Sequence, residues 1–231
     1  MLQPVLHSIA QLLFPRLCNG CGSDLVTGRH LLCARCFEQL FPTAFIDLPD
    51  NPVEKMLWGR LRFQAAMSGY FFTKGALMQK VIHQFKYRGN KALGVYCGEL
   101  MGTLLAASHR FVKPDVLVPL PLFQDKERKR GYNQSALLCE GIAAVLKIPV
   151  APGAVKRVRA TDTQTHKTRM ERWQNVEGVF LAPGQKNLGG KHILLVDDVI
   201  TTGATVEACG NAILEDIKDV KLSVATLACA V

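Results

Sequence analysis

The feature that most constrains the fold is the stretch HILLVDDVITTGATVEACGNAIL at residues 192–214. Residues 193–196 are all apolar with no polar alternation, which is typical of a strand covered on both faces in a parallel sheet. From Val206 onwards apolar residues recur at helical spacing. The adjacent acids Asp197 and Asp198 are therefore predicted at the carboxyl end of a central strand, just before a helix begins. Ligands bind at this place in open α/β sheets.

Strand-like and helical segments alternate through much of the rest of the chain. The predicted strands are 67–73, 115–120, 192–199 and 221–231, and the predicted helices include 76–87, 92–108 and 135–147. This alternation indicates an α/β fold with a parallel or mixed sheet and helices on both faces.

Four of the eight cysteines lie near the N-terminus in a C-x2-C, x11, C-x2-C array: Cys18, Cys21, Cys33 and Cys36. Two such pairs place four sulfurs around one ion, and Zn²⁺ suits four thiolates best. A site with four protein ligands has no open position, so the zinc is predicted to hold structure. Four free thiols or two CxxC redox pairs are the alternatives. The other cysteines lie in apolar surroundings, which favours buried thiols and a reducing cytoplasm over disulfides.

The chain divides into three parts on composition. Residues 1–41 are interpreted as an N-terminal helix followed by the four-cysteine zinc module, and residues 56–231 as the α/β domain. The stretch 42–55 between them contains three prolines and several acids, which indicates a linker. The apolar residues 1–14 lack a basic leader and a cleavage site, so we expect a short docking helix. No apolar run is long enough to predict a membrane span.

The net charge of +9 is concentrated in the middle of the chain. Counted from the sequence, residues 51–110 carry 9 − 2 = +7 and residues 111–180 carry 12 − 7 = +5, while both ends are slightly negative. This distribution suits an anionic partner, either a phosphorylated metabolite or a nucleic-acid backbone. A solubilising surface is the simpler alternative.

Basic residues beside aromatic rings and amides form a candidate contact surface for single-stranded DNA. The predicted contacts are Lys86, Arg88, Arg128, Lys129, Arg130 and Tyr132. The alternative is that these cations neutralise a pyrophosphate or face water.

The acids and the following turn form a candidate sugar-phosphate site. Asp197 and Asp198 suit neighbouring sugar hydroxyls. The turn Thr201, Thr202, Gly203, Ala204 and Thr205 offers hydroxyls and N–H groups at a helix N-terminus, where a phosphate binds. Together they describe a pocket for ribose 5-phosphate. An ordinary capped turn is the alternative.

The sequence also resembles a known family. ILLVDDVITTGAT is similar to the phosphoribosyl pyrophosphate (PRPP) motif of type I phosphoribosyltransferases. Together with the four-cysteine head and the segments HQFKYRGNKAL, VPLPLFQDKERKRGYNQSALL and TQTHKTRMERWQNVEGVF, the chain resembles the ComF/GntX family. The resemblance implies a type I phosphoribosyltransferase-like fold with an N-terminal zinc ribbon. It also implies a cytoplasmic role in natural transformation and in the uptake and use of DNA, with partners among DNA-uptake or processing proteins.

The resemblance further implies roles for individual residues. Asp197 and Asp198 would hold the 2′- and 3′-hydroxyls of PRPP. They are also the candidate catalytic residues, because in a transfer reaction their carboxylates would favour the positive charge on the sugar ring. Residues 201–205 would hold the 5′-phosphate, the turn 119–122 would be the pyrophosphate loop, and Mg²⁺ would accompany PRPP. Segment 161–175 resembles the hood over the pocket, with matching positions at Gln164, Arg169, Arg172 and Asn175.

Three functions are compatible with these features. The first is a protein that handles single-stranded DNA and binds PRPP as a sensor or second anchor. The second is an active phosphoribosyltransferase acting on a nucleobase or another nitrogen nucleophile, although the sequence identifies no acceptor. The third is a structural adaptor whose zinc ribbon docks a partner protein.

Overall fold

The computed structural model describes residues 16–159 and 178–230. In chain order the elements are α2 (Ala34–Glu38), α3 (Pro52–Leu57), β1 (Ala66–Phe71), α4 (Leu77–Tyr87), α5 (Lys91–Ala107), β2 (Val116–Pro119), α6 (Gln124–Arg130), α7 (Gln134–Leu146), β3 (Lys156–Arg157), β4 (Phe180–Leu181), the 3₁₀ turn η1 (Lys186–Leu188), β5 (His192–Ile200), α9 (Ala204–Asp216) and β6 (Lys221–Cys229). The predicted strands and long helices are confirmed close to their expected limits. The short elements α2, α3, α6, β3 and β4 were not predicted.

The predicted parallel sheet is also confirmed. Four strands lie in the order β1-β6-β5-β2, and every neighbouring pair is parallel. Strand β5 lies inside the sheet, with Leu195 opposite Val118 of β2 on one side and Val224 of β6 on the other. None of the helices in the described ranges is long and apolar enough to cross a membrane.

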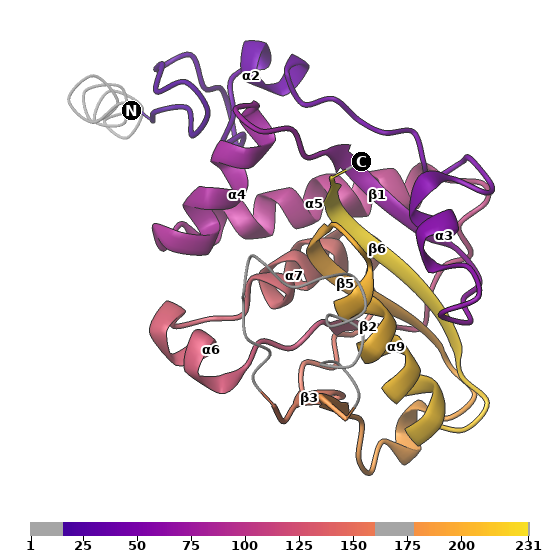
Figure 1. The fold of residues 1–231 in the computed structure, drawn as a ribbon. Helices are drawn as coiled ribbons and strands as arrows, with labels where there is room; N and C mark the ends of the chain where they lie inside the picture. The colour runs from indigo at the N-terminus through magenta and orange to yellow at the C-terminus, as the bar shows by residue number, and fades with distance from the viewer. Residues whose placement is uncertain (1–15, 160–177, 231) are drawn as a thin grey trace, which may run out of the picture.

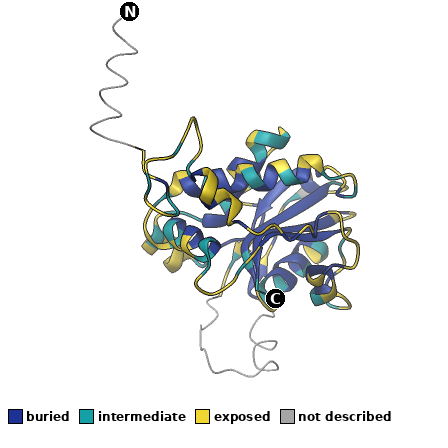
Figure 2. Cartoon of the chain, turned by 90° about the horizontal axis from the view of Figure 1, so that it is seen from above, coloured by how far each residue is buried: buried dark blue, intermediate teal, exposed yellow. Residues whose placement is uncertain are grey.

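Helices cover both faces of the sheet, which explains the continuous apolar run of β5. Leu194 and Val196 belong to a buried cluster with residues of α4, α5 and α7. Ile193 and Leu195 belong to a second cluster with residues of α3 and α9. The ribbon shows these two groups of helices on opposite sides of the strands (Figure 1), and the burial colours show the strands enclosed between them (Figure 2). Because both faces are apolar environments, no position in this run favours a polar side chain.

Helices α5 and α7 pack against each other through glycines. A Cβ atom on Gly98 would lie 2.2 Å from the carbonyl oxygen of Leu138, and one on Gly141 would lie 2.1 Å from that of Val95. The backbones can approach this closely only without side chains at these positions. Helix α7 also packs on β2 and β5, so this contact holds its N-terminus beside the acids of β5.

The segment 42–55, interpreted from the sequence as a linker, is packed against the sheet. Asn51 caps α3 and its side-chain amide donates to the carbonyls of Phe45 and Ala66 at 3.1 and 2.8 Å. Val53 is fully buried in the cluster under α9. The segment connects the two predicted parts of the chain, but its own residues contribute to the core.

The four-cysteine segment also shares the main core. Cys18, Cys33 and Cys36 lie in the same buried cluster as Val81 and Phe85 of α4. The side chain of Gln84 donates to the carbonyl of Asn19, and Asn90 Nδ2 donates to Asn19 Oδ1 at 2.7 Å. The cysteine module and α4 are therefore packed together.

Candidate functional site

The two acids of the central strand point to different partners. Asp197 and Asp198 both belong to β5, which continues to Ile200, and both are buried. Asp197 Oδ1 accepts a hydrogen bond from Ser135 Oγ at the start of α7, at 3.1 Å. Asp198 Oδ1 lies 2.8 Å from the ammonium group of Lys86 near the end of α4. The acid pair is therefore held by side chains of α4 and α7, two helices that share one buried cluster on the same face of the sheet.

Asp198 retains a carboxylate oxygen that is available to a ligand. Its Oδ2 atom is buried and accepts no hydrogen bond from the residues of the ranges 16–159 and 178–230. A buried carboxylate oxygen without a donor is costly, so such an atom is a candidate for completion by a water, an ion or a ligand. Among the described residues, this oxygen is the candidate contact atom of the acid pair.

The environment of Asp197 favours its protonated form. Burial, and then the negative charge of Asp198, raise the pKa of Asp197 to about 7. Hydrogen bonds from the Asp198 amide and Ser135, and the charge of Lys86, oppose this rise. The positive charge of Arg157 on β3 also interacts with Asp197, although burial is the main cause that lowers the pKa of Arg157. A cation or hydroxyl donor brought to this site would favour the ionised carboxylate.

The turn after β5 has the form expected of a phosphate-binding turn. Thr201 and Thr202 are exposed, and helix α9 begins at Ala204. Gly203 has φ = 75°, which a residue with a side chain rarely adopts, and a Cβ there would lie 3.0 Å from Leu57. The first amides of α9 have no intrahelical acceptor, so this turn presents free N–H groups beside two hydroxyls.

Arg60 supports this turn, although no sequence motif marks it. Its Nη1 atom donates to the carbonyl oxygens of Thr202 and Met56, each at 3.0 Å. Its Nη2 atom pairs with the carboxylate of Glu207, which is buried in the first turn of α9. The residues in contact are 147 positions apart, so no local pattern could have revealed the pair.

The loop after β2 lies beside the acids. The amide of Leu120 donates to the carbonyl of Val196 at 2.9 Å, directly before the acid pair. The side chain of Asn133, the cap of α7, donates to the carbonyl of Leu120 at 3.0 Å. The turn 119–122 and the acid pair therefore share one edge of the sheet.

The two predicted basic segments, around residues 86–91 and 126–132, are brought together in space. The guanidinium of Arg130 lies over the ring of Tyr87, 5.4 Å from its centroid. The ammonium of Lys91 lies over the ring of Tyr132, 5.2 Å from its centroid, and the Tyr132 hydroxyl donates to the carbonyl of Phe85. One mixed basic and aromatic surface therefore combines the ends of α4 and α6.

Within this surface the individual residues differ in position. The ammonium of Lys86 is directed to Asp198, so we assign Lys86 to the acid site rather than to the outer surface. Arg88 is exposed, as are Arg128 and Lys129 on α6, a helix without buried residues. Tyr87 is 68 % exposed, so its ring is more accessible than that of the half-buried Tyr132.

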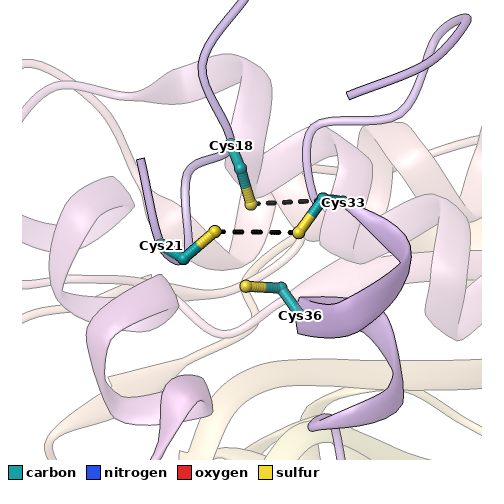
Figure 3. A group of neighbouring side chains, drawn as sticks. All are labelled: Cys18, Cys21, Cys33 and Cys36. Atoms are coloured by element: carbon teal, nitrogen blue, oxygen red, sulfur yellow. Dashed lines mark hydrogen bonds between the residues drawn. The ribbon is translucent and has the colours of Figure 1, made fainter. Parts of the chain in front are cut away.

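The four cysteines of the N-terminal module converge. Their sulfur atoms all lie within 4.8 Å of one another, and Figure 3 shows them directed toward a common centre. The sulfurs of Cys21 and Cys33 are 3.7 Å apart. Zinc–sulfur bonds of about 2.3 Å in a tetrahedron require sulfur–sulfur distances of about 3.8 Å, so the cluster can hold a metal ion such as zinc.

The surroundings favour the thiolate form at two of the four cysteines, Cys18 and Cys21, whereas burial raises the pKa of Cys36. The amides of Gly20 and Cys33 donate to the sulfur of Cys18 at 3.3 and 3.2 Å. Hydrogen bonds from Ser23 lower the pKa of Cys21 to about 6. A Cβ at position 20 would lie 2.7 Å from the sulfur of Cys36, so the first cysteine turn requires glycine there. Both features are expected where sulfurs bind a metal.

The proposed hood residues Gln164, Arg169, Arg172 and Asn175 lie outside the described residues.

Comparisons with known proteins agree on the family and the domain. The family described as "Phosphoribosyl transferase domain" matches residues 133–229, which include the acid pair and the turn after it. Competence protein F of Haemophilus influenzae is 38% identical over 194 residues, covering 82% of this chain and 74% of that protein. DNA utilization protein YhgH of Escherichia coli K12 is 30% identical over 205 residues, covering 87% and 78%.

Among solved structures, the glutamine PRPP amidotransferase from B. subtilis is similar to 62% of this chain and 30% of its own length, at 19% identity and a TM-score of 0.41. The match to the phosphoribosyl transferase domain and the parallel sheet with its flanking helices give the chain a phosphoribosyltransferase-type fold, with a four-cysteine cluster at its N-terminus.

Proposed function

Because the chain belongs to the ComF family of competence and DNA utilization proteins, we propose that it binds PRPP with Mg²⁺ at the acid edge, which is the edge of the sheet that carries Asp197 and Asp198. We also propose that it handles single-stranded DNA at its basic surface. The role would be in natural transformation or in the use of DNA taken up by the cell, which places the protein in the cytoplasm beside DNA-uptake or processing proteins.

One observation carries the PRPP proposal. The acid pair, the turn 201–205 and the loop 119–122 meet at one edge of the sheet, within the region that matches the phosphoribosyl transferase domain. The acids suit the ribose hydroxyls, and the amides and hydroxyls of the turn suit the 5′-phosphate. The assignment of the pyrophosphate to the loop after β2 follows from the family resemblance and from the position of this loop beside the acids.

The same edge suits a divalent cation with the pyrophosphate. Carboxylate oxygens are preferred ligands of Mg²⁺, which binds proteins through few carboxylates and the phosphates of the substrate. The unpartnered Oδ2 atom of Asp198 is such an oxygen. When bound, Mg²⁺ would neutralise the pyrophosphate charge. Lys86, which now pairs with Asp198, would then be free to contact a phosphate.

For the cysteine module we propose a structural Zn²⁺. Cys18, Cys21, Cys33 and Cys36 would occupy all four tetrahedral positions, so the metal would hold the module on α4 and leave no site for a reactant.

The proposal of DNA contact depends on the basic surface. Arg88, Arg128, Lys129 and Arg130 are available to phosphates, and Tyr132 holds the loop before α7 on α4. Such a surface binds a strand mainly through its backbone, so affinity should fall steeply with salt.

Titration calorimetry tests the PRPP proposal. We expect saturable binding of Mg-PRPP to the wild-type protein and at least a tenfold loss of affinity in Asp198→Asn. Repeating the titration with a bound single-stranded oligonucleotide tests whether the two sites are coupled, since coupling must be reciprocal. No binding by the wild type would reject the PRPP site.

Charge reversal separates the two surfaces. The double variant Arg128→Glu/Arg130→Glu should lose most of its affinity for a single-stranded oligonucleotide at low salt and retain Mg-PRPP binding. Loss of both ligands with an unchanged melting temperature would contradict the assignment of separate surfaces.

A second candidate is an active phosphoribosyltransferase that transfers ribose 5-phosphate from PRPP to a nucleobase or another nitrogen nucleophile. The acid pair supports it, because carboxylates at the sugar would stabilise positive charge developing on the ring. Release of pyrophosphate that depends on a nitrogen acceptor, and that is lost in Asp197→Asn, would favour this function over binding alone.

A further inference from the structure

A groove lies between the first cysteine turn and the outer side of α4, away from the acid edge. It has a volume of about 410 Å³ and is lined by Gly20, Gln79, Lys80, His83, Gln84 and Arg88. Apart from Arg88, none of these residues belongs to the surface proposed above. The groove is a separate feature, and its chemistry indicates what it binds.

The wall formed by α4 is basic and polar. Gln79, His83 and Tyr87 follow one another at intervals of four residues, and Lys80, Gln84 and Arg88 form a second row beside them. Residues four apart lie on the same side of a helix, so the two rows make one continuous face. The sequence of α4 contains no acid, so its exposed charges are all positive. This face is complementary to a chain of phosphates, whereas the Gln84 amide holds the cysteine turn on α4 by donating to the carbonyl of Asn19.

Tyr87 continues one of these rows and connects the groove to the basic surface. The ring of His83 lies 5.0 Å from that of Tyr87, and the guanidinium of Arg130 on α6 lies 5.4 Å from its centroid. The Tyr87 ring is nevertheless 68 % exposed. An exposed ring beside the cations Arg130 and Arg88 is suited to stacking with a nucleobase while the cations hold the adjacent phosphates.

We infer that the groove between the first cysteine turn and α4 is part of a single-strand binding track, in which Tyr87 stacks on a base and Lys80 and Arg88 contact phosphates. The track runs along α4, about 16 Å long for 11 residues, and continues onto α6 at Arg130. This inference rests on the proposed DNA function and extends it to the metal module, since Gly20 forms the wall opposite α4.

The arrangement favours a single strand over a duplex. Stacking on Tyr87 requires an unpaired base whose face is open, and the groove is bounded by the cysteine turn on one side. Base–aromatic stacking is tolerant of sequence, so the track should show little preference among bases.

Fluorescence anisotropy with a labelled dodecathymidylate tests the track. We expect Lys80→Glu to weaken binding about tenfold at low salt and to reduce the slope of log affinity against log salt by about one or more. Tyr87→Ala should weaken binding about tenfold, whereas Tyr87→Phe should retain it within about twofold, because the stacking face is kept. The matched control is Lys218→Glu, an exposed charge before β6 at the opposite end of the strands, which should change affinity little.

The outcomes separate this inference from the function on which it rests. If Lys80→Glu and Tyr87→Ala bind like Lys218→Glu while Arg128→Glu/Arg130→Glu loses the strand, the groove is excluded and the proposed DNA function stands. If the wild type binds no oligonucleotide, both fail. If a 12-base-pair duplex binds as tightly and is as sensitive to Tyr87→Ala, stacking on an unpaired base is rejected. Unchanged melting temperature and metal content show that each variant is folded.

Discussion

The cysteine module and the acid edge of the sheet both gather polar groups in partly or fully buried positions, but they do so in opposite ways. The four sulfurs come from 19 consecutive residues, 18–36, and lie within 4.8 Å of one another. The acid edge combines Lys86, Ser135 and Asp197–Asp198, which are far apart in the sequence. Short sequence spacing brings the four sulfurs together, whereas the packing of helices on the sheet brings the residues of the acid edge together.

The two regions also differ in what stabilises them. In the cysteine module the four thiolates would repel one another, and a bound metal ion would attract all of them. Metal binding and folding of the module are therefore linked. At the acid edge, buried carboxylates oppose folding unless partners offset the loss of hydration. Functional sites commonly contain groups that bind a ligand but lower the stability of the ligand-free protein. The following changes test this contrast, in order of decreasing effect.

Breaking the cysteine cluster should have the largest effect. Cys33→Ser removes a buried ligand, so we expect near-complete loss of bound zinc and a fall in melting temperature of about 10 °C, since the module shares the core of α4. Metal analysis and thermal unfolding measure both. Cys97→Ala, at a buried cysteine outside the cluster, is the control and should keep its zinc. Retention of zinc by Cys33→Ser would contradict a four-sulfur site.

Neutralising Asp197 should stabilise the ligand-free protein at high pH. Because the pKa of Asp197 is raised from 3.8 to about 7 in the folded state, its protonated form contributes stability that is fully present below the unfolded-state pKa and is lost as the pH rises through about 7. Asp197→Asn should therefore be more stable than the wild type at pH 8.5, by on the order of 2 kcal/mol or roughly 5 °C, with a smaller difference at pH 5 and little difference near pH 3.5.

Thermal unfolding of the two proteins at several pH values measures this difference. Asp125→Asn, at an exposed position on α6, should leave the pH profile unchanged. A variant less stable than the wild type at pH 8.5 would show that the partners of Asp197 more than offset its burial.

Removing the support of the turn 201–205 should have a smaller effect. Arg60→Met leaves the buried Glu207 without its cation and the Thr202 carbonyl without a donor. We expect a loss of about 1–2 kcal/mol, because Arg60 is partly exposed. The double variant Arg60→Met/Glu207→Gln should recover part of this loss in chemical denaturation. No recovery would mean that the packing of Arg60, rather than its charge, is responsible.

Weakening the connection between the two regions should have the smallest effect. Asn19→Ala removes the hydrogen bonds of this side chain to Leu31 and Asn90 but leaves its backbone carbonyl for Gln84. We expect about 1 kcal/mol of destabilisation with full zinc content, measured by denaturation and metal analysis. Loss of zinc would show that the cysteine module depends on α4 to form.

The sequence by itself determined the elements and motifs whose signals are local. The apolar run of β5 predicts a strand covered on both faces because periodicity records the environment of each residue. The spacing of the cysteines predicts their cluster, and the acids followed by a Thr/Gly-rich turn predict the edge of the sheet where they lie. The turn required glycine at position 203, and the structure shows the positive φ that explains it.

Only the tertiary structure decided which distant residues meet. Lys86 was predicted to contact DNA or to neutralise a pyrophosphate, and the packing of α4 on the sheet pairs it with Asp198. Arg60 carries no motif, yet the fold brings it to Glu207 and the turn 201–205. The segment 42–55 has the composition of a linker, but Asn51 and Val53 pack into the sheet domain. The physical reason is that local patterns encode burial and backbone geometry, whereas contacts between distant charges depend on how whole helices and strands pack together.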